Sequence, residues 1–296
     1  MRLPAAAEAR AGAPDVLPAP AGRPVIDAFD MAAHAHADRP AIRYHGQAMS
    51  YRELTLLAAG VADRLGADPG AVGVAARHAP GTVAGLLGIW AAGGTYCPID
   101  PAYPVPRREA MLAAAGCRSY LDAGKLPGCA DEIEVRAVPD PDAGADPRGD
   151  VAYILFTSGS TGEPKPVMTP PGAIAATVQS LRSLFELSPA DRVLQFASLN
   201  WDTCFEEILP TLSSGACLVF DDDAYSGSFP RLLRLIDREQ VSVLDLPTAF
   251  WHELVHHLTE DAAELPDCVR LVVTGGEAVR PDRLADWLVL GTGARL

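Results

Sequence analysis

The chain has 296 residues, of which 49% are hydrophobic and 21% charged, and its formal net charge at pH 7 is −14. This balance is typical of a globular protein with one large domain or two packed subdomains. The negative charge argues against a nucleic-acid backbone as the main partner. No stretch approaches the roughly 18 uninterrupted apolar residues of a membrane span. We therefore expect neither nucleic acid nor a membrane as a partner.

Six cysteines are scattered along the chain without a Cys-x-x-Cys pair or a zinc-binding spacing. Some lie in apolar stretches such as GACLVF (215–220), where a free cysteine behaves as a small buried hydrophobe. This usage favours a reducing cytoplasm over a disulfide framework. Residues 1–24 are rich in Ala and Pro and lack the apolar segment of a signal peptide. We expect them to form a disordered leader.

From about residue 25, the first half of the chain alternates between helical and strand-like stretches. The segment 51–65 has helical spacing, with Ser50 as a plausible N-cap. The segment 81–94 predicts an apolar helix that ends in two glycines. Strands are predicted by the short apolar stretches 71–76, 117–123, 132–138 and 151–156, the last of them after a polar loop at 139–150.

The second half repeats this alternation. Helices are expected near 171–186, 203–212, 229–239 and 248–259, and strands at 192–198, 216–220, 241–246 and 269–274. Short apolar strands between amphipathic helices predict an α/β fold with mainly parallel, buried sheets. Two such runs, separated by the loop at 139–150, predict two stacked mainly parallel-sheet subdomains with flanking helices.

The sequence ILFTSGSTGEPKPV (154–167) carries an apolar strand directly into a loop rich in Gly, Ser and Thr. Such a loop, outside the carboxyl end of a strand, is where α/β proteins bind phosphates. Glycines let the backbone approach an anion, and hydroxyl and N–H groups donate to its oxygens. Lys165 adds a positive charge on a long stem. The pattern differs from the P-loop, and a flexible turn is the alternative reading.

The stretch TSGSTGEPK (157–165) resembles the phosphate-loop motif of the adenylate-forming enzymes. Four further blocks resemble motifs of this superfamily in the same order: MSYREL (49–54), AAGGTYCPIDPAYPVPR (91–107), ASLNWDTCFEEILPTLSSGACLV (197–219) and VVTGGEAV (272–279). The block at 91–107 is most similar to the amino-acid adenylation domains of nonribosomal peptide synthetases. The resemblance covers 25–296, which we take as the N-terminal part of an AMP-binding adenylation domain.

The resemblance implies a two-step reaction. An amino-acid carboxylate attacks the α-phosphorus of Mg²⁺-bound ATP, and the aminoacyl-AMP then passes its acyl group to the phosphopantetheine thiol of a peptidyl carrier protein. Residues implied to hold the phosphates are Thr157, Ser158, Gly159, Ser160, Thr161, Gly162 and Lys165. Residues implied to lie beside the adenine are Gly275, Gly276 and Glu277.

The same resemblance implies a substrate pocket. Asp202, in WDTCFEE (201–207), would pair with the α-ammonium of the substrate, and the other implied pocket residues are Thr203, Glu206, Asp245, Val273 and Gly275. Two further carboxylates in a small-molecule pocket need a partner or a raised pKa. A second ammonium, as in lysine, ornithine or β-lysine, would supply that partner. In the alternative reading, Asp202 caps a helix, Glu206 faces solvent and Asp245 bonds the backbone.

A competing motif is His252-Glu253-x-x-His256, the zinc-protease pattern. On a helix, the two histidines would share a face and could bind zinc, with Glu253 as general base. No third ligand is evident in the sequence, and we expect no metal site. A zinc metalloprotease is therefore the less favoured reading.

The chain ends where an aromatic-Gly-Pro-Thr-Glu motif would follow in the family, so the catalytic Lys of the small C-terminal domain would lie beyond Leu296. We expect no catalytic residue within these 296 residues and no adenylation by them alone. A second reading is a naturally truncated, non-catalytic relative that binds a nucleotide or a partner.

Overall fold

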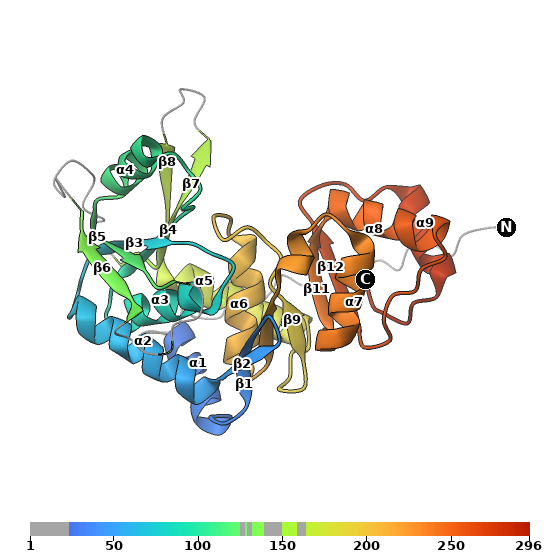
Figure 1. The fold of residues 1–296 in the computed structure, drawn as a ribbon, viewed down its shortest axis with the longest axis horizontal. Coiled ribbons are helices and arrows are strands. Elements are labelled where there is room, and N and C mark those ends of the chain that lie inside the picture. The colour runs from blue at the N-terminus through green and yellow to red at the C-terminus, as the bar shows by residue number, and fades with distance from the viewer. Residues whose placement is uncertain (1–23, 125–127, 129–131, 139–149, 159–163) are drawn as a thin grey trace, which may run out of the picture.

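The computed structural model describes residues 24–124, 128, 132–138, 150–158 and 164–296. Two six-stranded sheets form the framework, and Figure 1 shows them side by side with helices around and between them. Within both sheets, neighbouring strands run parallel except at three edge pairs, β1–β2, β5–β6 and β7–β8. The predicted fold class, two mainly parallel sheets with flanking helices, is confirmed.

Sheet A runs in the order β12 (Leu271–Gly275), β11 (Val243–Pro247), β9 (Arg192–Leu194), β10 (Cys217–Phe220), β1 (Pro40–Tyr44) and β2 (Gln47–Ser50). Sheet B runs in the order β6 (Glu134–Ala137), β5 (Cys117–Asp122), β3 (Ala71–Ala75), β4 (Thr95–Ile99), β7 (Tyr153–Ser158) and β8 (Pro164–Thr169).

The sequence pattern predicted that the loop 139–150 separates the two sheets, and this prediction is wrong. Strands β7 and β8 follow that loop but complete sheet B, and β1 and β2 precede it but join sheet A. The pattern failed here because strand pairing depends on contacts between distant residues. Ile42 of β1, for example, pairs with Leu218 of β10.

A central layer of helices packs between the sheets: α1 (Pro24–Ala35), α2 (Tyr51–Leu65), α3 (Pro80–Ala91), α5 (Pro171–Leu184) and α6 (Thr203–Ser213). Their buried side chains form one core with residues of both sheets, such as Val74 of β3 and Phe220 of β10. A second cluster joins α4 (Val105–Ala114) to sheet B. A third joins sheet A to α7 (Phe229–Glu239), α8 (Thr248–Glu260) and α9 (Pro281–Leu290).

Local signals explain several element boundaries. The Ser50 side chain accepts a hydrogen bond from the amide of Glu53, and the Glu53 side chain accepts one from the amide of Ser50, so α2 begins with a capping box. The start of α1 at Pro24 leaves most of the predicted leader outside the described residues. Where the structure is described, no helix combines the length and the apolar character needed to span a membrane.

Candidate active site at the carboxyl edge of sheet A

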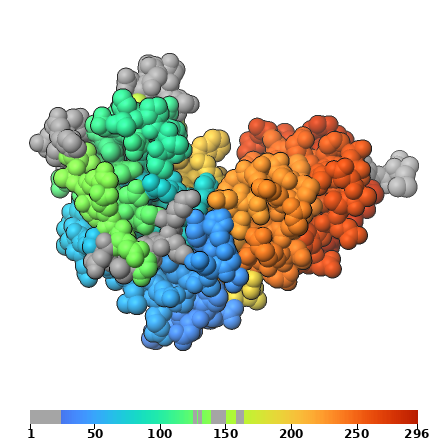
Figure 2. All heavy atoms as spheres, viewed as in Figure 1, coloured from blue at the N-terminus to red at the C-terminus, as the bar shows by residue number. Residues whose placement is uncertain are grey.

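A cavity of about 720 Å³ opens where three parallel strands of sheet A end. Its wall comes from the segments that leave β9, β11 and β12 and from the start of α6. This edge of a parallel sheet is where α/β proteins bind ligands, and the volume is within the roughly 300–1,000 Å³ of small-molecule sites. Figure 2 shows a notch in the molecular outline between the green and the orange parts, with atoms from the region near residue 200 at its floor.

The predicted pocket residues come together in this cavity. Thr203, Glu206, Asp245, Val273 and Gly275 all line it, although they come from three different elements. Asp202 lies just outside the lining, exposed at the start of α6 between two lining residues, Trp201 and Thr203. Its side chain makes no capping hydrogen bond to α6, so the structure does not show the alternative role as a helix cap.

The carboxylates of this cavity influence one another. Burial raises the pKa of Asp245 to about 7, and the charge of Glu206 adds to that rise. Burial also raises the pKa of Glu206, and the charge of Asp202 adds to it. The Oδ2 atom of Asp245 is buried without a hydrogen-bond partner in the described structure. An unpaired buried carboxylate oxygen is costly, so this wall is suited to a ligand that brings a cation or a donor.

Thr248 shapes the rim formed by Gly275, Gly276 and Glu277. Its buried hydroxyl donates to the carbonyl of Gly275 at 2.9 Å and lies 3.3 Å from the carbonyl of Glu277. Gly276 has a φ of +92°, a conformation in which any other side chain would be strained. The three residues predicted to lie beside the adenine therefore border the same cavity, held by the first residue of α8.

The predicted phosphate loop connects β7 and β8. Thr157 pairs with Lys165 across these antiparallel strands, so the two residues face each other at the base of the loop, and both are exposed. Ser158 is the last residue of β7. Gly159, Ser160, Thr161 and Gly162 lie outside the described residues. The loop leaves the carboxyl end of a sheet B strand, as the sequence indicated.

The structure does not favour zinc binding at His252 and His256. Both residues lie on α8, but His252 is buried whereas His256 is exposed. The Nε2 atom of His252 accepts a hydrogen bond from the amide of Arg280 at 3.0 Å, so its lone pair is already used. Among the described residues, no group of three His, Cys, Asp or Glu side chains could hold a metal ion.

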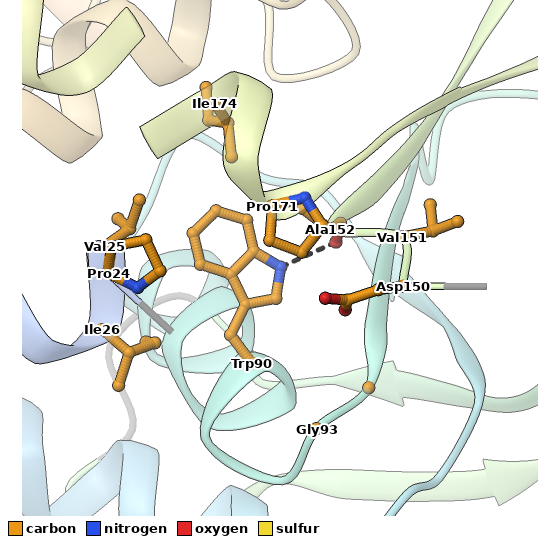
Figure 3. A pocket seen from close by; sticks show the side chains of 11 residues that line it. Pro24, Val25, Ile26, Trp90, Gly93, Asp150, Val151, Ala152, Pro171 and Ile174 are labelled. Atoms are coloured by element: carbon orange, nitrogen blue, oxygen red, sulfur yellow. Dashed lines mark hydrogen bonds between the residues drawn. The ribbon is translucent and has the colours of Figure 1, made fainter. Parts of the chain in front are cut away.

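A second cavity, of about 70 Å³, lies between α1 and the Trp90 side chain (Figure 3). The indole N–H of Trp90 donates to the carbonyl of Ala152 at 2.7 Å. A water molecule requires roughly 10–15 Å³ of such volume, so this cavity has room for a few waters but not for an amino acid or a nucleotide. The larger cavity is therefore the candidate site.

Sequence reasoning assigned no role to several residues that shape this cavity. Phe196 and Trp201 line it, and Trp201 is 70% exposed. Thr248 orders its rim, and the buried Glu207 holds the loop between β9 and α6. The available signal was the position of these residues just after the carboxyl ends of predicted strands, which marks the binding edge without giving a role to each residue.

Comparison with known proteins agrees with this geometry. The chain matches the family described as "AMP-binding enzyme" over residues 29–296. It is 36% identical to the isonitrile lipopeptide synthase of Streptomyces coeruleorubidus over 298 residues, which cover 95% of this chain and 20% of the synthase. The chain thus spans about a fifth of the length of that relative.

Solved structures show the same fold. The N-terminal subdomain of Klebsiella oxytoca NpsA, in complex with 3-hydroxyanthranilyl-AMSN, has a TM-score of 0.72 and 25% identity, with 90% of this chain and 70% of that chain covered. Holo-PA1221, a nonribosomal peptide synthetase protein with adenylation and PCP domains, has a TM-score of 0.72 and 26% identity, with 91% of this chain and 48% of that chain covered.

These matches cover most of the chain, and the solved structures agree with its two-sheet fold. The chain belongs to the AMP-binding enzyme family, in the branch of the nonribosomal peptide synthetase adenylation domains. The predicted resemblance is confirmed, and the zinc-protease alternative is not favoured.

Proposed function

We propose that this chain is the substrate-selecting part of a ligase that activates an amino acid with a basic side chain as its aminoacyl-AMP, at the expense of ATP. The observation that carries the proposal is the buried, unpartnered Oδ2 atom of Asp245 in a cavity that Glu206 also lines. Membership of the AMP-binding family supports the nucleotide part of the proposal.

The charge pattern of the cavity supports a substrate with two ammonium groups. The charge of Asp202 adds to the rise in the pKa of Glu206, and the charge of Glu206 adds to the rise in the pKa of Asp245, so Glu206 is electrostatically coupled to both other carboxylates. One α-ammonium at Asp202 would leave the other two unbalanced. A second ammonium, as in lysine, ornithine or β-lysine, would neutralise them, and a neutral side chain would leave buried charge without a partner.

The adenylation step would bring the pocket of sheet A together with the loop of sheet B. The substrate carboxylate would attack the α-phosphorus of ATP, and pyrophosphate would leave. Thr157 and Lys165 stand at the base of the predicted phosphate loop, where a hydroxyl and an ammonium can donate to phosphate oxygens. Gly275, Gly276 and Glu277 would border the adenine, and Mg²⁺ would accompany the phosphates. These roles are expected from the family resemblance.

A carrier-protein thiol would be the acyl acceptor. Two findings support this part of the proposal: the relative from Streptomyces is a lipopeptide synthase, and the similar PA1221 protein contains a PCP domain beside its adenylation domain. The thiol would attack the acyl carbon of the aminoacyl-AMP, and AMP would leave.

Ligand binding tests the proposal with the chain as it is. Three of its four tryptophans (Trp90, Trp251 and Trp287) are buried, whereas Trp201 is exposed on the cavity wall, so Trp201 emission should report occupancy. We expect lysine or ornithine to change this emission at concentrations at least tenfold lower than norleucine, which has a side chain of similar length without the ammonium.

A Trp201→Phe variant should lose the signal while calorimetry still detects lysine. Equal affinity for lysine and norleucine would contradict the basic substrate class, and binding of neither would contradict the site itself. Lysine-dependent ATP–pyrophosphate exchange would separately test whether this chain can complete the first half-reaction.

A further inference from the structure

Glu207 is a completely buried carboxylate one residue after the pocket residue Glu206. Only 1% of Glu207 is exposed, and among the described residues its hydrogen bonds come from neutral donors. Its Oε1 atom accepts from the amides of Phe196 and Ala197, each at 2.9 Å, and its Oε2 atom accepts from the side-chain amide of Gln195 at 2.8 Å. The carboxylate thus accepts all three hydrogen bonds. Burial and the charge of Asp245 raise the pKa of Glu207 well above its usual range, and these hydrogen bonds act in the opposite direction.

The backbone that Glu207 holds is part of the cavity wall. Phe196, Ala197 and Ser198 lie in the segment just after β9 and all line the cavity. Glu206 and Glu207 are consecutive in α6, so anchoring Glu207 in the interior also fixes the rotation of the helix turn that presents Glu206 to the cavity. One buried side chain therefore sets the position of two walls of the candidate site.

Gln195 extends this network to the other sheet. Its amide nitrogen donates to Glu207 and, at 2.6 Å, to the carbonyl of Ala197, so its oxygen faces Nδ1 of His78 at 2.6 Å, and that nitrogen must be the donor. His78 lies between β3 and α3 of the sheet B half. The hydroxyl of Tyr225 donates to the backbone carbonyl of Gln195 at 2.5 Å. The chain His78–Gln195–Glu207 thus joins the two halves beside the cavity.

We propose that Glu207 is a positioning residue of the substrate pocket. In the same proposal, the His78–Gln195 hydrogen bond, called here the inter-sheet joint, fixes the position of this pocket relative to sheet B, which carries the predicted phosphate loop. The ligand part of this inference rests on the proposed function. The effect of Glu207 on the segment between β9 and α6 does not depend on that function.

The first experiment compares Glu207→Gln with Glu239→Gln. Glu239 lies on α7, is 2% exposed and pairs with Arg43 at 2.6 Å, away from the cavity, so its variant makes the same chemical change at a similarly buried carboxylate. Hydrogen exchange without ligand should show faster exchange of the Phe196 and Ala197 amides in Glu207→Gln only. For the folded protein, the Kd for lysine should rise at least tenfold in Glu207→Gln and stay within twofold in Glu239→Gln.

The second variant, His78→Phe, keeps the ring shape but removes the donor to Gln195. It leaves the sheet A wall intact, so we expect lysine affinity to stay within twofold of the wild type. A non-hydrolysable lysyl-adenosine sulfamate would span both halves, and its affinity should fall at least fivefold. This milder change keeps the inference testable if Glu207→Gln does not fold.

The outcomes separate the two proposals. Failure of the wild-type chain to bind lysine would overturn the proposed function, and the exchange of the two amides would still test the role of Glu207. Unchanged amide exchange in Glu207→Gln, or equal loss of lysine affinity in Glu207→Gln and Glu239→Gln, would overturn the positioning role. If His78→Phe binds the sulfamate as tightly as the wild type, the proposed role of the His78–Gln195 hydrogen bond is wrong.

Discussion

Glu206 of α6 and Asp245 of β11 line one cavity, and the charge of Glu206 adds to burial in raising the pKa of Asp245 to about 7. These residues are far apart in sequence, and neither has a cation beside it in the described part of the cavity wall. The two carboxylates therefore lower the stability of the ligand-free protein and attract a cationic ligand.

The cost should be visible in the pH dependence of stability. Asp245 has its pKa raised to about 7 from an ordinary 3.8, so its protonated form favours the folded state and this contribution is lost as the pH rises from about 4 to 7. At about 1.4 kcal/mol per tenfold change, Asp245→Asn should raise the free energy of unfolding at pH 8 by up to about 4 kcal/mol. At pH 4 the difference should nearly vanish.

Urea unfolding of both proteins at pH 4 and pH 8 would measure this effect. The exposed Asp63 of α2 provides a control, because Asp63→Asn should change stability little at either pH. A stabilisation by Asp245→Asn that is equal at both pH values would rule out the titration of Asp245 as its cause.

The attraction should be visible in ligand selectivity. Glu206→Gln keeps the size of the side chain but removes one charge from the cavity wall. A charged hydrogen bond contributes about 1.5–3 kcal/mol, so lysine binding should weaken by roughly 10- to 100-fold, whereas norleucine binding should not weaken. Calorimetric titration of both amino acids would measure this change. Equal weakening of the two would point to a structural defect instead.

Close packing between α2 and α3 gives a prediction about stability alone. A Cβ atom at Gly88 would lie 2.5 Å from Cβ of Val61 and 2.6 Å from the carbonyl oxygen of Ala58. Because the backbone of α2 cannot easily move away, Gly88→Ala should lower the free energy of unfolding by about 2 kcal/mol. One turn earlier, Gly85→Ala would place its Cβ 3.2 Å from the flexible tip of Leu121 and at an ordinary contact distance of 3.6 Å from Val74, and should be nearly neutral. Thermal unfolding of the two variants would compare these effects, and equal melting temperatures would contradict the prediction.

The ion pair between Asp191 and Arg270 gives a prediction with the opposite pH dependence. Burial by itself raises the pKa of Asp191, but hydrogen bonds from Arg270 and two serines lower it overall. Arg270→Gln leaves this buried carboxylate without its cation, 2.6 Å away in the wild type, and should cost about 3 kcal/mol at pH 7. Since a lowered pKa stabilises the folded state only above its ordinary value of 3.8, the loss should shrink as the pH falls below that value.

Chemical unfolding between pH 3 and pH 7 would measure this loss. Arg136 pairs with the exposed Glu134, and Arg136→Gln serves as the matched control because exposed ion pairs contribute little to stability. A loss from Arg270→Gln no larger than that of the control would show that the buried pair is not needed for stability.

Elements with strong local signals could be predicted from the sequence. The helix α2 has its N-cap and its apolar spacing within the same few residues, and α7 was predicted at its observed bounds. The hairpin β1–β2 and the strand β8 were not predicted. The strands β2 and β8 are short edge strands with mixed polarity, and β1 is a short strand that pairs with β10 and β2. The pairing partners of these three strands, rather than their own residues, decide their conformation.

The site could be predicted only in part. Asp245 and Glu206 were identified by resemblance, because no local pattern indicates that residues on a strand and on a distant helix line one cavity. Glu207 was missed, since an acidic residue on an amphipathic helix usually faces water. Only the fold shows that this turn of α6 packs inward against the loop after β9.

The crossing of the chain between the sheets has a consequence for how the protein can be divided. Sheet A needs β1 and β2 from the beginning of the chain, and sheet B needs β7 and β8 from beyond residue 150. A cut at the loop 139–150 would therefore produce two fragments that each lack strands of a sheet. Neither fragment should fold independently. The fold should form only in the intact chain or when both fragments are mixed.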